Sequence, residues 1–220
     1  MYLQFLLCTL IAFVVWKKKV LSFPASSLAF LFALSIWVFN GFGWMAILLS
    51  FLVFAFVVTK WKYDVKKELE VQEASLGERD IENVIGNGAA AMFFALAFMP
   101  TAFCGAVAAA LSDTMASEIG VLSDKTRMIT NLQKVKPGTN GAISPLGMTF
   151  SFIGAAIISL LGYLVLSLNP FACLVGGFLG CQVDSYLGAT LERKGYLSNS
   201  LVNLISTFAG GGIAFLIATV

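Results

Sequence analysis

Residues 41–67 read GFGWMAILLSFLVFAFVVTKWKYDVKK. The first part is an apolar run without a charged residue, and the second part holds four lysines together with Trp61 and Tyr63. A helix needs about 20 apolar residues to cross a bilayer, and Trp and Tyr gather at the membrane–water boundary. This stretch therefore predicts a helix that crosses the membrane over residues 43–59 and reaches water at Lys60.

The rest of the chain has the same character. Its 220 residues are 59% hydrophobic and only 12% charged, whereas soluble proteins carry about 25% charged residues. A soluble fold of this size could not bury that much apolar surface, so the lipid bilayer must be the solvent for most of it. The net charge of +2 gives no reason to expect a nucleic-acid partner.

Similar apolar runs predict the fold class. We expect an all-α, polytopic integral membrane bundle that forms a single domain over residues 1–220, with cytoplasmic loops at 60–81 and 122–146. Lys66 and Glu70, spaced i,i+4, suggest a solvated helix in the first loop. About eight transmembrane helices are expected, at 2–15, 20–38, 43–59, 82–99, 102–121, 147–167, 171–190 and 198–219. The first run is short, and its sequence leaves open whether it spans fully.

Lysine and arginine predict the orientation. All 14 lie in four groups, at 17–19, 60–79, 125–136 and 193–194, and the connections at 39–42, 100–101 and 168–170 have none. Cytoplasmic loops carry the excess of basic residues. We therefore expect both termini outside, in a cell or plastid-type membrane, with an active site that faces the cytoplasm.

Three acidic residues stand inside the predicted membrane runs. Asp113 and Glu118 lie in AVAAALSDTMASEIGVL (106–122), and Asp184 lies in GGFLGCQVDSYLGATLE (176–192). Such residues are costly in lipid and are usually functional. The chain has no histidine, which argues against zinc and against a Ser-His or Cys-His dyad. Oxygen ligands without histidine or thiolate favour Mg²⁺.

Two glycine-rich segments precede predicted helices on the same face. They are GERDIENVIGNG (77–88) and KPGTNGAISPLG (136–147), and neither matches the P-loop pattern GxxxxGK[ST]. Backbone N–H groups and a helix dipole at such places bind anions. Asn199 and Asn203, at the start of the last run, are expected to face the same zone.

Five segments carry a resemblance to a known family. In order they are GERDIENVIGNG, SDTMASEIG (112–120), TRMIT (126–130), KPGTNGAISPLG and DSYLGATLE (184–192). Together they resemble the integral membrane family of phytyl-phosphate kinase and transmembrane protein 19, once catalogued as domain of unknown function 92. The resemblance covers roughly residues 20–220.

The resemblance implies a Mg²⁺-dependent kinase. It would transfer a phosphoryl group from a nucleoside triphosphate, with CTP expected, to phytyl or geranylgeranyl phosphate in the bilayer. Asp113, Glu118 and Asp184 would hold one or two Mg²⁺ ions, while Arg127 and Lys134 would neutralise charge. Contacts to phosphate or nucleotide are expected from Arg79, Asn83, Asn87, Gly88, Ser117, Gly138, Thr139, Asn140, Gly141, Ser144 and Asn203.

Other functions stay open on sequence grounds. A cytidylyltransferase that forms a CDP-lipid needs similar metal ligands, and a prenyl alcohol kinase needs similar lipid contacts. A transporter also uses intramembrane acids, but it predicts polar groups on both faces. The outer connections here carry no charge, which favours chemistry on one side. The sequence leaves the oligomeric state open.

Overall fold

The computed structural model describes residues 2–70 and 78–220, and this part of the chain is almost entirely helical. Its long helices number eight and have 16 to 22 residues. They are α1 (Tyr2–Lys17), α2 (Phe23–Asn40), α3 (Phe42–Lys60), α5 (Ile81–Leu96), α6 (Pro100–Gly120), α7 (Pro145–Leu166), α8 (Pro170–Leu187) and α9 (Asn199–Thr219).

Shorter elements lie in three of the connections between the long helices, among the residues that the structure describes. They are helix α4 (Tyr63–Glu68), the antiparallel strands β1 (Arg127–Met128) and β2 (Ala142–Ile143), and the π-helical turn η2 (Gly188–Glu192). The first predicted loop, 60–81, is described except for residues 71–77. The all-α bundle expected from sequence is confirmed, because each apolar run corresponds to one long helix, with ends that differ by a few residues.

The long helices differ in how well they suit a bilayer. Within the described residues, α2, α3, α7 and α9 are long and apolar enough to cross it, whereas α1 and α5 are apolar but shorter. Helices α6 and α8 carry Asp, Ser and several Gly residues among their apolar ones. Whether α6 and α8 can lie within the bilayer therefore depends on the residues that surround them inside the bundle.

Helix α6 lies at the centre of the bundle. It packs against α3, α5, α7, α8 and α9, and 16 of its 21 residues are buried. Small residues let its neighbours approach closely. A Cβ atom at Gly154 of α7 would lie 2.9 Å from the Leu111 carbonyl oxygen, and one at Gly180 of α8 would lie 2.7 Å from the Ala109 Cβ. Protein rather than lipid encloses α6, so polar side chains on it are tolerated.

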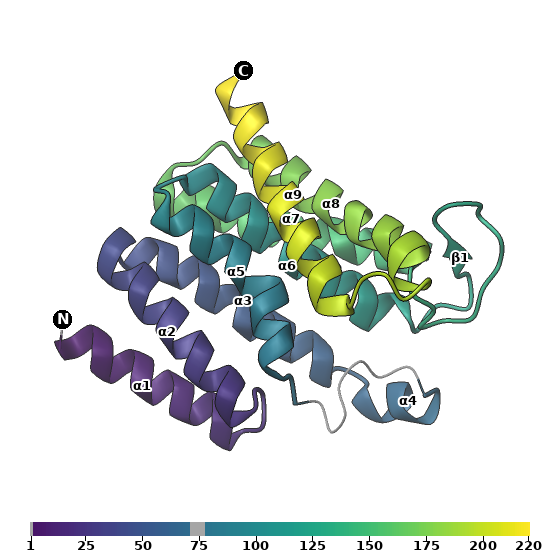
Figure 1. The fold of residues 1–220 in the computed structure, drawn as a ribbon, viewed down its shortest axis with the longest axis horizontal. Coiled ribbons are helices and arrows are strands. Elements are labelled where there is room, and N and C mark those ends of the chain that lie inside the picture. The colour runs from purple at the N-terminus through teal and green to yellow at the C-terminus, as the bar shows by residue number, and fades with distance from the viewer. Residues whose placement is uncertain (1, 71–77) are drawn as a thin grey trace.

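Figure 1 shows how the bundle is arranged. Helices α1 and α2 form one flank, and α6 to α9 form the other, with α3 and α5 between them. Helix α4 and the hairpin with β1 lie on the right of the view, away from the N-terminus at the left and the C-terminus at the top.

Helices α5 and α7 have capped first turns. The Asp80 side chain accepts a hydrogen bond from the Asn83 N–H at the start of α5, and the Ser144 hydroxyl accepts one from the Gly147 N–H at the start of α7. Such caps satisfy backbone donors that a helix start leaves unpaired. They fix where the two glycine-rich segments turn into helices.

Candidate functional site

A polar cavity of about 520 Å³ opens where α6 and α8 end and α7 begins. Asp113 of α6 and Asp184 of α8 both line it, as the sequence leads one to expect for residues that share a site. The structure adds Asn83, Ser117, Gly138, Thr139, Asn140, Gly141 and Ser144 from the predicted set.

The two aspartates are partly buried, and polar groups surround them. The Ser206 hydroxyl of α9 donates to Asp184 Oδ2 at 3.0 Å. Ser112 and Ser151, from α6 and α7, place their hydroxyl oxygens 2.8 Å apart, and Ser151 also lines the cavity. Two carboxylates on separate helices therefore share one polar cavity, and α6 and α8 pack directly against each other.

Glu118 does not join the two aspartates. Its Oε2 lies 2.6 Å from Lys66 Nζ and its Oε1 lies 3.3 Å from an Arg79 terminal nitrogen. Glu118 follows Asp113 by five residues, a rotation of about 140° around the helix, so the two side chains leave α6 in different directions. In the described residues no three His, Cys, Asp or Glu side chains are grouped to hold one ion. The structure therefore replaces the expected three-carboxylate cluster with a pair.

Lys66 also differs from its expected role as a solvated residue. Its side chain is 1% exposed, and Nζ donates to the carbonyl oxygens of Val58 and Thr59 at 3.1 and 2.8 Å. A buried ammonium needs such partners, because its desolvation is costly otherwise. Lys66 therefore anchors α4 to the end of α3 and to α6.

The expected charge-neutralising residues of the hairpin lie outside the cavity. Arg127 and Lys134 are both exposed, and the Arg127 guanidinium donates to the Leu132 carbonyl oxygen at 2.8 Å. Among the described residues the cavity lining contains no Lys or Arg, but it contains Glu70, Asp113, Asp184 and Glu192. An anionic ligand would therefore need cations to enter, because like charges repel strongly at short range.

The loop before α7 supplies part of the cavity wall. Gly138 and Gly141 have φ angles of 79° and 77°, which side chains rarely adopt. Two hydrogen bonds close the turn around these glycines: the Thr139 hydroxyl donates to the Lys136 carbonyl oxygen at 2.7 Å, and the Ala142 N–H donates to the Thr139 carbonyl oxygen at 2.9 Å. Both glycines are thus needed for the turn itself.

The start of α7 completes this wall. Ser144, Gly147 and Met148 line the cavity, and the Ser144 hydroxyl donates to the Gly120 carbonyl oxygen of α6 at 3.2 Å. A helix start carries a partial positive charge, and this one belongs to a helix of 22 residues. It lies in the otherwise acidic cavity and favours a phosphate group there.

The remaining predicted contacts lie elsewhere. Arg79, Asn87 and Gly88 line a second, apolar cavity, and Asn83 lines both. Asn203 is 7% exposed and lines neither, although its Nδ2 lies 3.5 Å from Asn199 Oδ1. Asn199, its neighbour one turn earlier, lines the polar cavity instead.

Sequence reasoning missed several residues of the polar cavity. They include Gln182, Ser185, Gly188 and Glu192 around Asp184. These positions recur at intervals of three or four, which places them on one face of a helix. The same spacing is visible in the sequence, where it would have marked the inner face of α8 and η2.

Comparison with known proteins gives the chain its relatives. A family model described as "Integral membrane protein DUF92" matches residues 6–211. An uncharacterized membrane protein of Methanocaldococcus jannaschii is 38% identical over 188 residues, which cover 81% of this chain and 78% of that protein. One from Synechocystis is 32% identical over 213 residues, covering 90% and 82%. The Arabidopsis thaliana "Protein VTE6, chloroplastic" is 27% identical over 220 residues, covering 89% and 65%. No solved structure matches the chain.

Proposed function

The chain belongs to the DUF92 family of integral membrane proteins, and we propose that it transfers a phosphoryl group from a nucleoside triphosphate to a prenyl monophosphate. The single observation that carries this proposal is the polar cavity that is lined by Asp113 and Asp184, on two helices, and by a glycine loop. The resemblance of the five motif segments to phytyl-phosphate kinases supplies the substrate class. Phytyl or geranylgeranyl phosphate is the proposed acceptor, and CTP the proposed donor.

The residues of the cavity fit Mg²⁺. Magnesium binds through one or two carboxylates, substrate phosphates and water, rather than through a closed cage of protein ligands. Asp113 and Asp184 would hold it, and when bound it would neutralise the charge of the nucleotide phosphates. The absence of basic side chains from the described lining then makes a divalent cation a requirement for binding the nucleotide.

The chemistry needs little beyond position and charge. An oxygen of the prenyl phosphate attacks the γ-phosphorus, and the bond from that phosphorus to the β-phosphate oxygen breaks to release the nucleoside diphosphate. A phosphate monoester is already largely ionised near neutral pH, so no general base has to remove a proton. The backbone N–H groups of residues 138–141 and the start of α7 would orient the phosphates.

The sidedness of the site is part of the proposal. The polar cavity is walled by residues 137–144, which form the second half of the β1–β2 hairpin and the turn into α7, next in sequence to the third basic group at 125–136. Because basic residues are in excess in this and the other loops on the same side, we place the end of the bundle with the polar cavity in the cytoplasm. Nucleotide would enter from there, and the lipid substrate would enter from the bilayer.

The direct test uses purified protein in lipid nanodiscs with geranylgeranyl phosphate, Mg²⁺ and each nucleoside triphosphate in turn. We expect geranylgeranyl diphosphate together with the nucleoside diphosphate, identified by mass. A CDP-lipid with released pyrophosphate would show a cytidylyltransferase instead. Phosphorylation of geranylgeraniol but not of its phosphate would show an alcohol kinase, and the absence of any product with all nucleotides would contradict the proposal.

A further inference from the structure

We infer that the second, apolar cavity holds the hydrocarbon chain of the phosphorylated lipid substrate and sets the chain length that the protein accepts. This inference rests on the proposed function for the identity of the lipid. The cavity lies between α1, α2, α3 and α5. Its walls are almost entirely apolar, with Val15, Phe30, Phe32, Leu48 and Phe51 among them.

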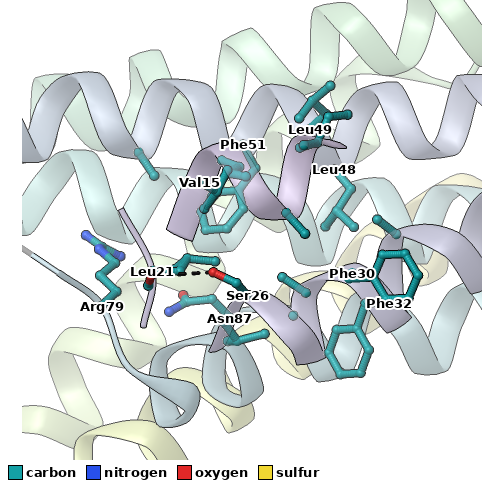
Figure 2. A pocket seen from close by; sticks show the side chains of 18 of the residues that line it. Val15, Leu21, Ser26, Phe30, Phe32, Leu48, Leu49, Phe51, Arg79 and Asn87 are labelled. Carbon is teal, nitrogen blue, oxygen red and sulfur yellow. Dashed lines mark hydrogen bonds between the residues drawn. The ribbon is translucent and has the colours of Figure 1, made fainter. Parts of the chain in front are cut away.

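The polar residues of this cavity lie at one end. In Figure 2, Arg79, Leu21 and Asn87 stand on the left, and Phe30, Phe32 and Leu48 stand on the right. The Ser26 hydroxyl, also at the polar end, already donates to the Leu21 carbonyl oxygen at 3.4 Å. The cavity therefore has the polarity of a lipid with one charged end and one long apolar end.

Backbone hydrogen bonds fix the polar end at the start of α2. The Arg79 N–H donates to the Val20 carbonyl oxygen at 3.0 Å, and the Ser22 N–H donates to the Arg79 carbonyl oxygen at 2.9 Å. Ala33 also lines the cavity and lies eleven residues beyond Ser22, or roughly 16 Å along the helix. The cavity thus extends over about half of the 30 Å hydrocarbon layer.

The polar end adjoins the proposed phosphoryl-transfer site. Asn83 lines both cavities, so a molecule with its chain in one would present its head group to the other. Arg79 stands at this junction, where its guanidinium donates to Thr59 Oγ1 at 3.1 Å and to Glu118 Oε1 at 3.3 Å. These contacts hold a cation in place beside the entering phosphate.

The apolar end faces helices that meet lipid. On α1 and α2 many large apolar side chains are exposed, including Phe5, Leu10, Leu31 and Phe39. Only 17% of α2 is buried inside the protein. We therefore place the entry of the hydrocarbon chain at these helices, because a route from the bilayer there does not pass through water. A single-chain lipid phosphate satisfies both ends, whereas a nucleotide or a sugar phosphate satisfies only the polar end.

The first test measures binding and does not depend on turnover. A geranylgeranyl phosphate analogue with a diazirine at the far end of its chain is photolysed with the wild-type protein in nanodiscs. We expect the label near Ala33, Leu48 and Leu49, and we expect unlabelled geranylgeranyl phosphate to compete while phosphatidic acid does not. Labelling outside these helices, or equal competition by phosphatidic acid, would overturn the inference.

The second test narrows the apolar end. Ala33→Phe should lower kcat/KM for geranylgeranyl phosphate by about tenfold or more, on the scale of lost apolar contacts, and leave that for dimethylallyl phosphate within about twofold of wild type. Ala218→Phe, at an exposed position on α9, is the matched control and should change neither. A folded Ala33→Phe protein with the wild-type preference would overturn the inference, and if that variant does not fold, the photolabelling result decides.

The two proposals can fail separately. If the photoprobe labels the apolar cavity, unlabelled lipid competes with it, and the protein makes no diphosphate, the result supports the site for the hydrocarbon chain and contradicts the proposed kinase activity. Diphosphate formation with labelling elsewhere would support the kinase and reject the chain site.

Discussion

Three carboxylates that look alike in the sequence have different neighbours in the structure. Asp113 and Asp184 line a polar cavity, whereas Glu118 is 3% exposed and is paired with Lys66 and Arg79. A carboxylate whose oxygens are held by two cations is poorly available to a metal ion. The expected role of Glu118 is therefore to join α6 to α4 and to the residues before α5.

Replacing either cavity aspartate should remove activity without unfolding the protein. Asp113→Asn and Asp184→Asn keep size and shape but lose the charge that would hold Mg²⁺, and kcat should fall by about a hundredfold or more. The melting temperature without ligand should stay the same or rise, because a neutral amide costs less to bury. Asp64→Asn, exposed on α4, is the matched control. A folded variant with more than about half of wild-type activity would refute the assignment.

Glu118→Gln should destabilise the protein, whereas the two aspartate substitutions should not. The substitution leaves the ammonium of Lys66 buried without its carboxylate, and breaking a buried pair in this way costs about 3–5 kcal/mol. We expect a clear loss of thermal stability in detergent, measured by the melting temperature. Unchanged stability combined with lost Mg²⁺ dependence would instead return Glu118 to the metal site.

The sequence could show which residues are chemically unusual but not which ones meet. Asp113 and Asp184 stand out in the sequence because charge inside an apolar run is rare. Nothing in the spacing of Lys66 and Glu70 showed that Lys66 turns inward to the Val58 and Thr59 carbonyl groups. Such long-range pairs depend on how α4 packs after α3, and one sequence carries no signal for that packing.

The two glycines of the loop before α7 should respond differently to substitution. A Cβ atom at Gly141 would collide with the backbone of Ala189 in η2, so Gly141→Ala should lower both stability and kcat. Gly138 has a similar φ and, like Gly141, lines the cavity that contains the aspartates. Gly138→Ala should mainly raise the nucleotide KM, with a stability loss of about 1 kcal/mol from backbone strain.

Steady-state kinetics with varied nucleotide, together with melting curves, separate the two effects. Ala89→Gly, on α5 and outside both cavity linings, serves as a control for loss or gain of a methyl group. An unchanged nucleotide KM in folded Gly138→Ala protein would mean that the loop only turns the chain.

Helix positions were more predictable than helix roles. The predicted run at 43–59 agrees with α3 to within one residue at each end. Length and apolar composition determine whether a segment can be a membrane helix. The sequence does not predict the central position of α6, although the many Ala and Gly residues of this helix permit close packing on all sides. The composition of a helix permits such packing, but the arrangement of the neighbouring helices determines whether it occurs.

The basic loops should all face one side of the membrane. Leu132→Cys, exposed in the hairpin, and Lys194→Cys, exposed after η2, should react with impermeant reagents from the cytoplasmic side only. Phe42→Cys, exposed at the turn between α2 and α3, should react only from outside. The native cysteines are all buried, so the wild-type protein provides the background. Labelling of residues 132 and 194 from opposite sides would contradict the eight-helix topology.

We propose that the terminal phosphoryl group of a nucleotide passes to a prenyl phosphate in the acid-lined cavity. The most direct measurement follows radioactive phosphorus from CTP labelled at either the α or the γ position into the lipid product. We predict that only the γ label reaches the lipid, and that its transfer falls by about a hundredfold or more in Asp113→Asn and Asp184→Asn. Appearance of the α label in the lipid, or undiminished γ transfer in both folded variants, would contradict the account.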